Sequence, residues 1–268
     1  MTATFRILGC GSSGGVPRIG NDWGDCDPQD PRNARTRCSA LVTRSGLGGT
    51  TRVLIDASPD LRVQLLAAGV GAIDAVLVTH SHADHVHGLD DLRAIVINTR
   101  RRLPVWADAP TSAALRARFG YAFETPPGSG YPPICDLHRI QGPVTVDGPG
   151  GPLTFQPFEV EHGDIPSLGF RVGALAYLPD VSAIPEAIWP ALDNLDVWVV
   201  DALRRKPHPS HAHLARTLEW IARARPARAV LTNMHVDLDF ATLAAELPPG
   251  TEPAQDGLEI AFDPSSAP

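Results

Sequence analysis

The sequence predicts an α/β protein. Short hydrophobic segments of strand character alternate along the chain with segments whose apolar residues have helical spacing. Histidines and aspartates follow directly after several of these strands, and open α/β sheets place their ligands at that end of the strands. The chain has 268 residues, 43% of them hydrophobic, which is enough for a sizeable core. Together these observations indicate a compact α/β fold with its functional residues near strand ends.

The first half of the chain is rich in strands. The strands expected here span residues 5–8, 39–43, 52–55, 75–79 and 104–107, and the helices span 60–68, 89–99 and 113–119. The second and third strands are expected to form a hairpin, and Gly69 is the expected C-cap of the first helix. The Pro- and Gly-rich segment 125–133 is expected to be an ordered loop or lid.

The second half continues the alternation. Strands are expected at residues 144–146, 153–161, 167–172, 174–178, 197–200 and 229–231, with helices at 185–192 and 212–223. No break in composition and no repeat period divides the chain. We therefore expect one domain over residues 1–262, followed by a flexible tail at 263–268.

A dense group of metal-binding side chains follows the strand at 75–79. Residues 80–88 read His-Ser-His-Ala-Asp-His-Val-His-Gly. His80 and His82 share one side of an extended segment, whereas Asp84 and His85 are adjacent and must diverge. One loop can therefore serve two metal ions, and the nitrogen and oxygen donors suit zinc.

The motif His80-x-His82-x-Asp84-His85 resembles the signature of the metallo-β-lactamase superfamily. The glycine-rich loop at residues 9–17 and the continuation at 88–93 are similar to its phosphodiesterase branch, which includes the enzymes that open phosphoribosyl cyclic phosphate in bacterial phosphonate breakdown. The resemblance covers residues 4–262. It implies a four-layer αβ/βα sandwich of two mixed sheets with helices outside.

The resemblance also implies a set of ligands for two divalent ions, zinc or manganese. His162 would complete a first site with His80 and His82, and Asp180 would bridge both ions. The second site, with Asp84 and His85, needs one more ligand. Relatives carry histidine where this chain has Asn233, so we expect His235, two residues on and on the same face of an extended segment, with Asn233, water or Asp237 as alternatives.

Catalytic and substrate-binding roles follow from the same resemblance. His211 is the expected general acid, and a helix-start histidine in solvent is its alternative. Asp56 resembles the carboxylate that orients the metal loop. Ser12 and Ser13 are expected to contact phosphate, with a plain glycine turn as the alternative, and Arg37 is a further substrate contact. Relatives hold a structural zinc through several cysteines near residue 26, but this chain has only Cys26 there, so we expect that zinc to be absent.

Taken together, the sequence predicts a dinuclear phosphodiesterase that attacks a small cyclic or nucleotide-like phosphate ester with a metal-bridging hydroxide. A tRNA 3′-processing nuclease, a thioester or lactone hydrolase of the glyoxalase II type, and a metal- or redox-sensing binding module are the alternatives. The net charge of −7 argues against a long nucleic acid as partner. Four scattered cysteines and the lack of an export or membrane signal favour a cytoplasmic protein. Homodimerisation is left open.

Overall fold

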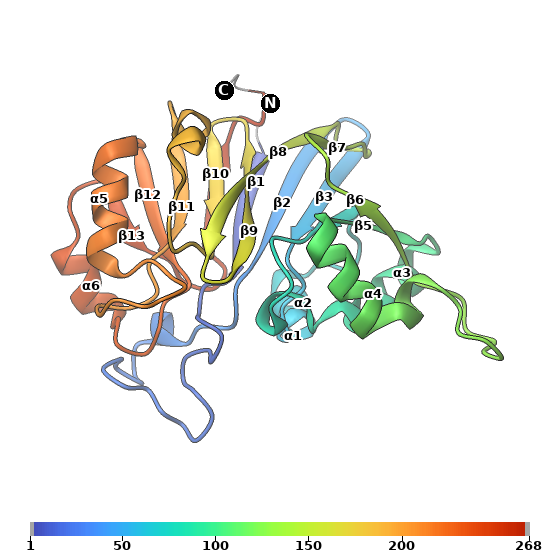
Figure 1. The fold of residues 1–268 in the computed structure, drawn as a ribbon, viewed down its shortest axis with the longest axis horizontal. Helices are drawn as coiled ribbons and strands as arrows, with labels where there is room; N and C mark the ends of the chain where they lie inside the picture. Colours follow the sequence, from blue (N-terminus) through green and yellow to red (C-terminus); the bar gives the residue numbers. More distant parts are fainter. Residues whose placement is uncertain (1–2, 266–268) are drawn as a thin grey trace.

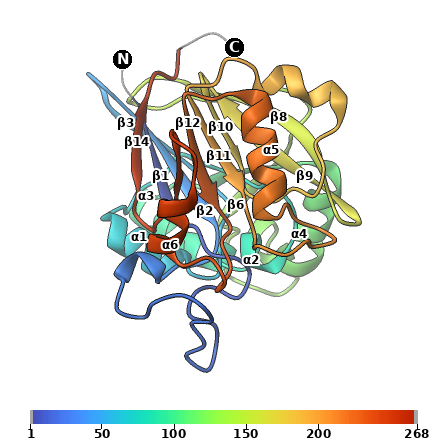
Figure 2. The same cartoon turned by 90° about the vertical axis from the view of Figure 1, so that its left-hand side faces the viewer.

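The computed structural model describes residues 3–265, so the end of the tail expected at 263–268 lies outside it. Two seven-stranded mixed sheets face each other, and helices cover their outer faces (Figures 1 and 2). The first sheet has the order β14-β1-β2-β3-β4-β5-β6, and the second has the order β13-β12-β11-β10-β9-β8-β7. This is the arrangement of layers that the sequence predicts.

The first sheet is antiparallel from β14 to β3 and parallel from β3 to β6. Its strands are β1 (Ala3–Gly9), β2 (Ser39–Gly46), β3 (Gly49–Ile55), β4 (Ala75–Leu77), β5 (Leu103–Ala107), β6 (Cys135–Arg139) and β14 (Glu259–Phe262). The helices of this half are α1 (Leu61–Ala68), α2 (Ala83–Val86), α3 (Leu92–Thr99) and α4 (Ala109–Phe123), with 3-10 turns at η1 (Pro31–Asn33) and η2 (Leu89–Asp91).

The second sheet is antiparallel from β7 to β10 and parallel from β10 to β13. Its strands are β7 (Val144–Val146), β8 (Leu153–His162), β9 (Ile165–Val172), β10 (Leu175–Leu178), β11 (Val197–Asp201), β12 (Arg228–Thr232) and β13 (Thr251–Pro253). The helices of this half are η3 (Glu186–Leu192), α5 (Leu214–Ala224) and α6 (Phe240–Glu246).

Alternation along the strands divides the core in two. In β3, Val53 and Ile55 belong to the cluster between the sheets, whereas Leu54 belongs to the cluster under the outer helices. The first of these clusters contains large side chains with almost no exposed surface, including Phe5 and Tyr177, whose rings pack between the sheets, and it extends to Leu214 of α5. The outer cluster includes Leu61 of α1 and Leu115 of α4.

Several expected elements differ in type or extent. The predicted hairpin is present, and Gly69 ends α1 with φ +65° as expected. The segment expected as a helix at 185–192 is the 3-10 helix η3, because Pro190 lies inside it and cannot donate an α-helical hydrogen bond. The expected helix at 89–99 is divided into η2 and α3. Strands β6, β13 and β14 and helices α2 and α6 were not predicted from the sequence.

In the described part of the chain, no helix combines the length and apolar character needed to span a bilayer.

Candidate metal centre

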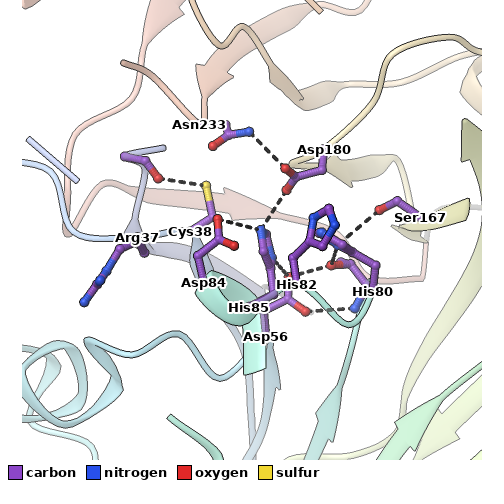
Figure 3. Close-up of polar contacts among 12 residues, drawn as sticks. Arg37, Cys38, Asp56, His80, His82, Asp84, His85, Ser167, Asp180 and Asn233 are labelled. Carbon is purple, nitrogen blue, oxygen red and sulfur yellow. Dashed lines mark hydrogen bonds and ion pairs between the residues drawn. The ribbon is translucent and has the colours of Figure 1, made fainter. Parts of the chain in front are cut away.

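The candidate site lies where strands of both sheets end, along the lower edge of the molecule in Figure 1. Each functional side chain lies at or just after such an end: Asp56 after β3, His80 after β4, His162 at the end of β8, Asp180 after β10, Asp201 at the end of β11 and Asn233 after β12. Helix α2 is a single turn with His82 as its N-cap residue, and it carries both Asp84 and His85. Segments far apart in the sequence therefore meet at one point (Figure 3).

Three imidazoles form the first group. One ligand atom each of His80, His82 and His162 lie within 4.8 Å of one another. Nε2 of His162 is 3.1 Å from Nδ1 of His82. A tetrahedral zinc ion with bonds of about 2.0 to 2.1 Å requires nitrogen atoms roughly 3.3 Å apart, so this pair has a suitable spacing.

Acceptors behind the histidine rings fix their orientation. Nδ1 of His85 lies 2.7 Å from a carboxylate oxygen of Asp56, and Nδ1 of His162 lies 2.6 Å from the carbonyl oxygen of Ser210. Thr79 donates its hydroxyl proton to Asp56, so its oxygen can accept from Nδ1 of His80 at 3.0 Å. The rings of His80, His85 and His162 therefore direct Nε2 into the site, whereas His82 presents Nδ1.

The second group contains buried polar atoms without hydrogen-bond partners. These are Nε2 of His80, Nε2 of His85 and Oδ2 of Asp180. The last two atoms lie 2.9 Å apart, but not in hydrogen-bond geometry. Buried polar atoms without partners are costly, and a divalent ion among them would satisfy all three. The side chains present therefore fit a metal site.

Burial and neighbouring charges set the protonation of these ligands. Burial lowers the pKa of His162 to about 4 and the pKa of His80 well below its usual value, so both imidazoles are neutral and keep a free lone pair. Burial also opposes charge on His85, but Asp180 and Asp56 raise its pKa well above normal. The carboxylates around His85 thus favour positive charge at this point, as a metal ion would supply.

The predicted ligand Asp84 faces the same cluster. Its Oδ2 lies 3.6 Å from Nε2 of His85, and its side chain is 18% exposed. Asp180 lies between the two groups, with Oδ2 near His85 and Oδ1 3.9 Å from Nε2 of His162. Six of the seven predicted ligands are therefore brought together.

The seventh predicted ligand, His235, is not brought to the cluster. Its Nε2 lies 3.3 Å from a guanidinium nitrogen of Arg18, and its Nδ1 lies 3.2 Å from Asp237. The expectation assumed an extended backbone, but Asn233 has φ +60°, which turns the chain so that residues two apart no longer share a face. Asn233 itself occupies the place beside Asp180, with its amide nitrogen 3.1 Å from Oδ1.

His211 lies beside the cluster and is held by a carboxylate that the sequence analysis missed. Its Nδ1 is 3.0 Å from Asp201 and 3.4 Å from Asp180, and its ring centroid is 4.6 Å from that of His162. Although burial alone would lower the pKa of His211, Asp201 and then Asp180 raise it to about 9. Asp201 ends a strand, as His162 does. Its place at a strand end is the signal in the sequence that could have identified Asp201 as a site residue.

The predicted substrate contacts have mixed surroundings. Arg37 forms a two-point ion pair with Asp60, with both nitrogen–oxygen distances at 2.6 Å, and its guanidinium points away from the cluster in Figure 3. Ser12 is buried, and its backbone N–H donates to the carbonyl of Met234, one residue from Asn233. Ser13 is exposed. The glycine-rich loop therefore borders the site, whereas Arg37 is already paired with a carboxylate.

Comparisons with known proteins agree with the fold and the site. The family model of the beta-lactamase superfamily domain matches residues 51–234. The structure also superposes on the crystal structure of a new diphosphatase from the PhnP family, with a TM-score of 0.88 and 36% identity over 98% of each chain. The chain therefore belongs to the beta-lactamase superfamily and, within it, to the PhnP family. Membership of this superfamily and the His/Asp cluster together identify the protein as a metal-dependent hydrolase.

Two curated relatives carry other names. A protein of Porphyromonas gingivalis named octanoyltransferase is 36% identical over 263 residues, which are 96% of this chain and 51% of that protein. This chain thus spans about half the length of that relative. A ribonuclease Z of a Mycobacterium species is 29% identical over 156 residues, covering 53% of each chain. The predicted fold class and superfamily are confirmed, while the substrate is a separate question.

Proposed function

We propose that this chain is a dinuclear phosphodiesterase that hydrolyses a small cyclic or nucleotide-like phosphate ester. The observation that carries the proposal is the pairing of the His/Asp cluster with His211, an imidazole held beside it by buried Asp201. Similarity to a diphosphatase of the PhnP family supports chemistry at phosphorus. The net charge of −7 supports a small substrate over a long nucleic acid.

In this proposal His80, His82 and His162 would hold one ion, and Asp84, His85 and Asp180 would hold the other. The two carboxylate oxygens of Asp180 face different groups, which suits a bridging ligand. Zinc and manganese both accept nitrogen and oxygen ligands of this kind. Two such ions would lower the pKa of a coordinated water towards neutrality and polarise a phosphoryl oxygen.

The protein's own contribution to bond cleavage centres on His211. Asp201 and Asp180 engage its Nδ1, which leaves Nε2 to donate a proton to the departing alkoxide. Against the effect of burial, the carboxylate of Asp201 raises the pKa of His211 and so favours the protonated imidazole that a general acid requires. Asp201 accepts from the backbone N–H of Val181 as well, so its carboxylate is fixed before substrate arrives.

Replacing Asp201 with asparagine should lower kcat by roughly 10- to 100-fold, because His211 loses the carboxylate that orients it and stabilises its charge. The loss should nearly vanish in a His211→Ala background, since Asp201 acts through that ring. The four proteins of this double-mutant cycle should be assayed on one phosphodiester, with thermal melting as the control for folding. Equal losses in both backgrounds would mean that Asp201 acts independently of His211.

Two further variants separate Asn233 from His235. Asn233→Gly keeps the positive φ but removes the amide that contacts Asp180 and Asp201, so the weaker metal equivalent should bind roughly 10-fold less tightly. His235→Ala should keep both metal affinities and lose about 1 kcal/mol of stability, because only its contacts to Arg18 and Asp237 disappear. Metal titration by calorimetry measures both affinities in each variant. If His235→Ala loses one metal equivalent, His235 is a metal ligand.

The direct test of the proposed function is a substrate panel with the metal-loaded protein. Cyclic phosphates, linear nucleotide diesters, thioesters and precursor tRNA should be assayed at equal enzyme concentration. Turnover of the small phosphodiesters at rates well above the other classes is the expected result. Turnover confined to thioesters or to tRNA would reject the proposal.

Thioester hydrolysis is the second candidate, because a relative with 36% identity carries the name octanoyltransferase. The match includes only 51% of that relative, so its name is no guide to which half performs the transfer. The leaving group of a thioester is a thiolate, which needs less protonation than the alkoxide that leaves from a phosphodiester. The presence of His211, positioned as a proton donor, therefore favours a phosphodiester substrate over a thioester.

A further inference from the structure

Asn233 lies where three neighbouring parallel strands end. Strands β10, β11 and β12 are side by side in the second sheet, and Asp180 follows the first, Asp201 ends the second and Asn233 follows the third. Neighbouring strands are about 4.8 Å apart, so a side chain after β12 reaches Asp180 only by crossing the end of β11. The left-handed backbone of Asn233, with φ +60°, allows this, and its amide contacts both carboxylates.

The amide nitrogen of Asn233 is the atom that faces the carboxylates. It lies 3.1 Å from Oδ1 of Asp180 and 3.3 Å from Oδ1 of Asp201, and all three side chains are buried. The reverse orientation of the amide would place its oxygen against carboxylate oxygens, which only accept hydrogen bonds. Asn233 therefore presents a hydrogen-bond donor to Asp180, and not an atom that could bind a metal ion (Figure 3).

The contact with Asp201 completes the support behind the proton donor. Oδ2 of Asp201 lies 3.0 Å from Nδ1 of His211 and accepts from the backbone N–H of Val181 at 3.1 Å. Oδ1 of the same carboxylate accepts from Asn233, which is its one hydrogen-bond donor among residues 3–265. Without that donor the carboxylate would be held through a single oxygen and would be free to rotate. Held at both oxygens, it keeps the imidazole of His211 at a fixed angle.

The same nitrogen connects this support with the metal centre. Oδ2 of Asp180 lies near His85, on the side where Asp180 is proposed to bridge two ions, and Oδ1 accepts from Asn233. Two buried carboxylates repel each other more strongly than they would in water, and a donor shared between them offsets this repulsion. A shift of Asp180 would therefore move Asp201 and, with it, the ring of His211.

We propose that Asn233 is a positioning residue that fixes the Asp201 carboxylate and thereby aligns His211 with the metal centre. This inference rests on the proposed phosphodiesterase function. Asn233 acts through Asp201, so its contribution belongs to the protonation of the leaving group. Substrates whose leaving group needs a proton should depend on Asn233, and substrates whose leaving group needs none should not.

Asn233→Gly keeps the left-handed backbone and removes the amide, so it tests the role of the donor. At saturating metal, kcat should fall about 10-fold for the dinucleotide ApA, which has an alkoxide leaving group, and less than about 2-fold for bis(4-nitrophenyl) phosphate. In an Asp201→Asn background, the loss on ApA should shrink to less than about 2-fold, because both residues act through His211. Thermal melting checks the folding of each variant.

Two further variants complete the experiment. Asn233→Asp keeps the shape of the side chain but replaces the donor with an acceptor, so its loss on ApA should equal or exceed that of Asn233→Gly. Asn194→Gly is the matched control, because Asn194 is an exposed asparagine with φ +53° outside the site, and its rates should equal those of the wild type.

The outcomes separate this inference from the proposed function. The inference fails, while the proposed function stands, if Asn233→Gly lowers turnover of both diesters equally or if its loss adds fully to that of Asp201→Asn. Wild-type hydrolysis of ApA by Asn233→Asp would overturn it as well. If the unmodified protein hydrolyses neither diester, both fail together.

Discussion

Replacing Asp84 with asparagine should abolish most phosphodiester hydrolysis, by a factor of roughly 10³ or more, while the protein stays folded. The carboxylate of Asp84 lies 3.6 Å from Nε2 of His85 and would supply negative charge to the proposed second ion site. An amide of the same size is a much weaker ligand, so that site should lose its metal. Because the side chain is partly exposed and sits on the single turn α2, folding should be spared.

The measurement pairs metal content by elemental analysis with the rate on one phosphodiester. Metal should fall from two equivalents towards one as activity is lost. Asp90→Asn is the matched control, because Asp90 lies on the adjoining turn, is 56% exposed and interacts with Arg93, at 2.8 Å, and with Tyr121, neither of which belongs to the cluster. An Asp84→Asn protein with wild-type turnover would remove Asp84 from the catalytic site.

Replacing His211 with alanine should leave both metal equivalents bound and lower kcat by roughly 10² to 10⁴, the range for loss of a general acid. The loss should be large for substrates with alkoxide leaving groups and small for nitrophenyl esters, whose leaving group needs little protonation. This dependence on the leaving group is expected because Asp201 and Asp180 contact Nδ1 of His211, which leaves Nε2 to protonate the leaving group.

His138→Ala is the control for that experiment. His138 is an exposed histidine that stacks on Trp106 at 4.7 Å, in a different part of the first sheet. Its removal should change neither leaving-group dependence nor metal content. Equal losses for good and poor leaving groups in His211→Ala would instead make His211 a binding residue.

Much of the candidate site was expected from the resemblance to the metallo-β-lactamase superfamily, and one rule agrees with that expectation for most of its residues. Polar residues that directly follow buried strands meet at a common edge, which brought His80, His162 and Asp180 together from distant parts of the sequence. The same rule also points to Asp201 at the end of β11, although Asp201 is absent from the predicted site. The carboxylate that orients His211 could therefore have been predicted from the sequence.

His235 was not predictable in this way. The period-two argument holds only while the backbone is extended, and Asn233 adopts a left-handed conformation that few residues other than glycine tolerate. Asparagine is among those few, so the residue type was compatible with this turn without requiring it. The contact between His235 and Arg18 depends on how the 18–26 loop folds back, which no local pattern specifies.

The elements that were missed are short or depend on distant partners. Strand β14 has four residues and pairs with β1 at the other end of the chain, so its alternation of exposed and buried residues is too brief to stand out. Strand β13 has three residues. Helix α6 did carry a local signal, since Asp239 accepts a hydrogen bond from the backbone N–H of Thr242 as an N-cap.

The most direct test of a dinuclear phosphodiesterase is a metal titration of the metal-free protein during turnover of adenosine 2′,3′-cyclic phosphate. Zinc and manganese should be tested in parallel, with bound metal measured at each step. Hydrolysis should remain low through the first equivalent and rise with the second, reaching a plateau at two ions per chain. Full activity at one equivalent, or in the metal-free protein, would contradict the account.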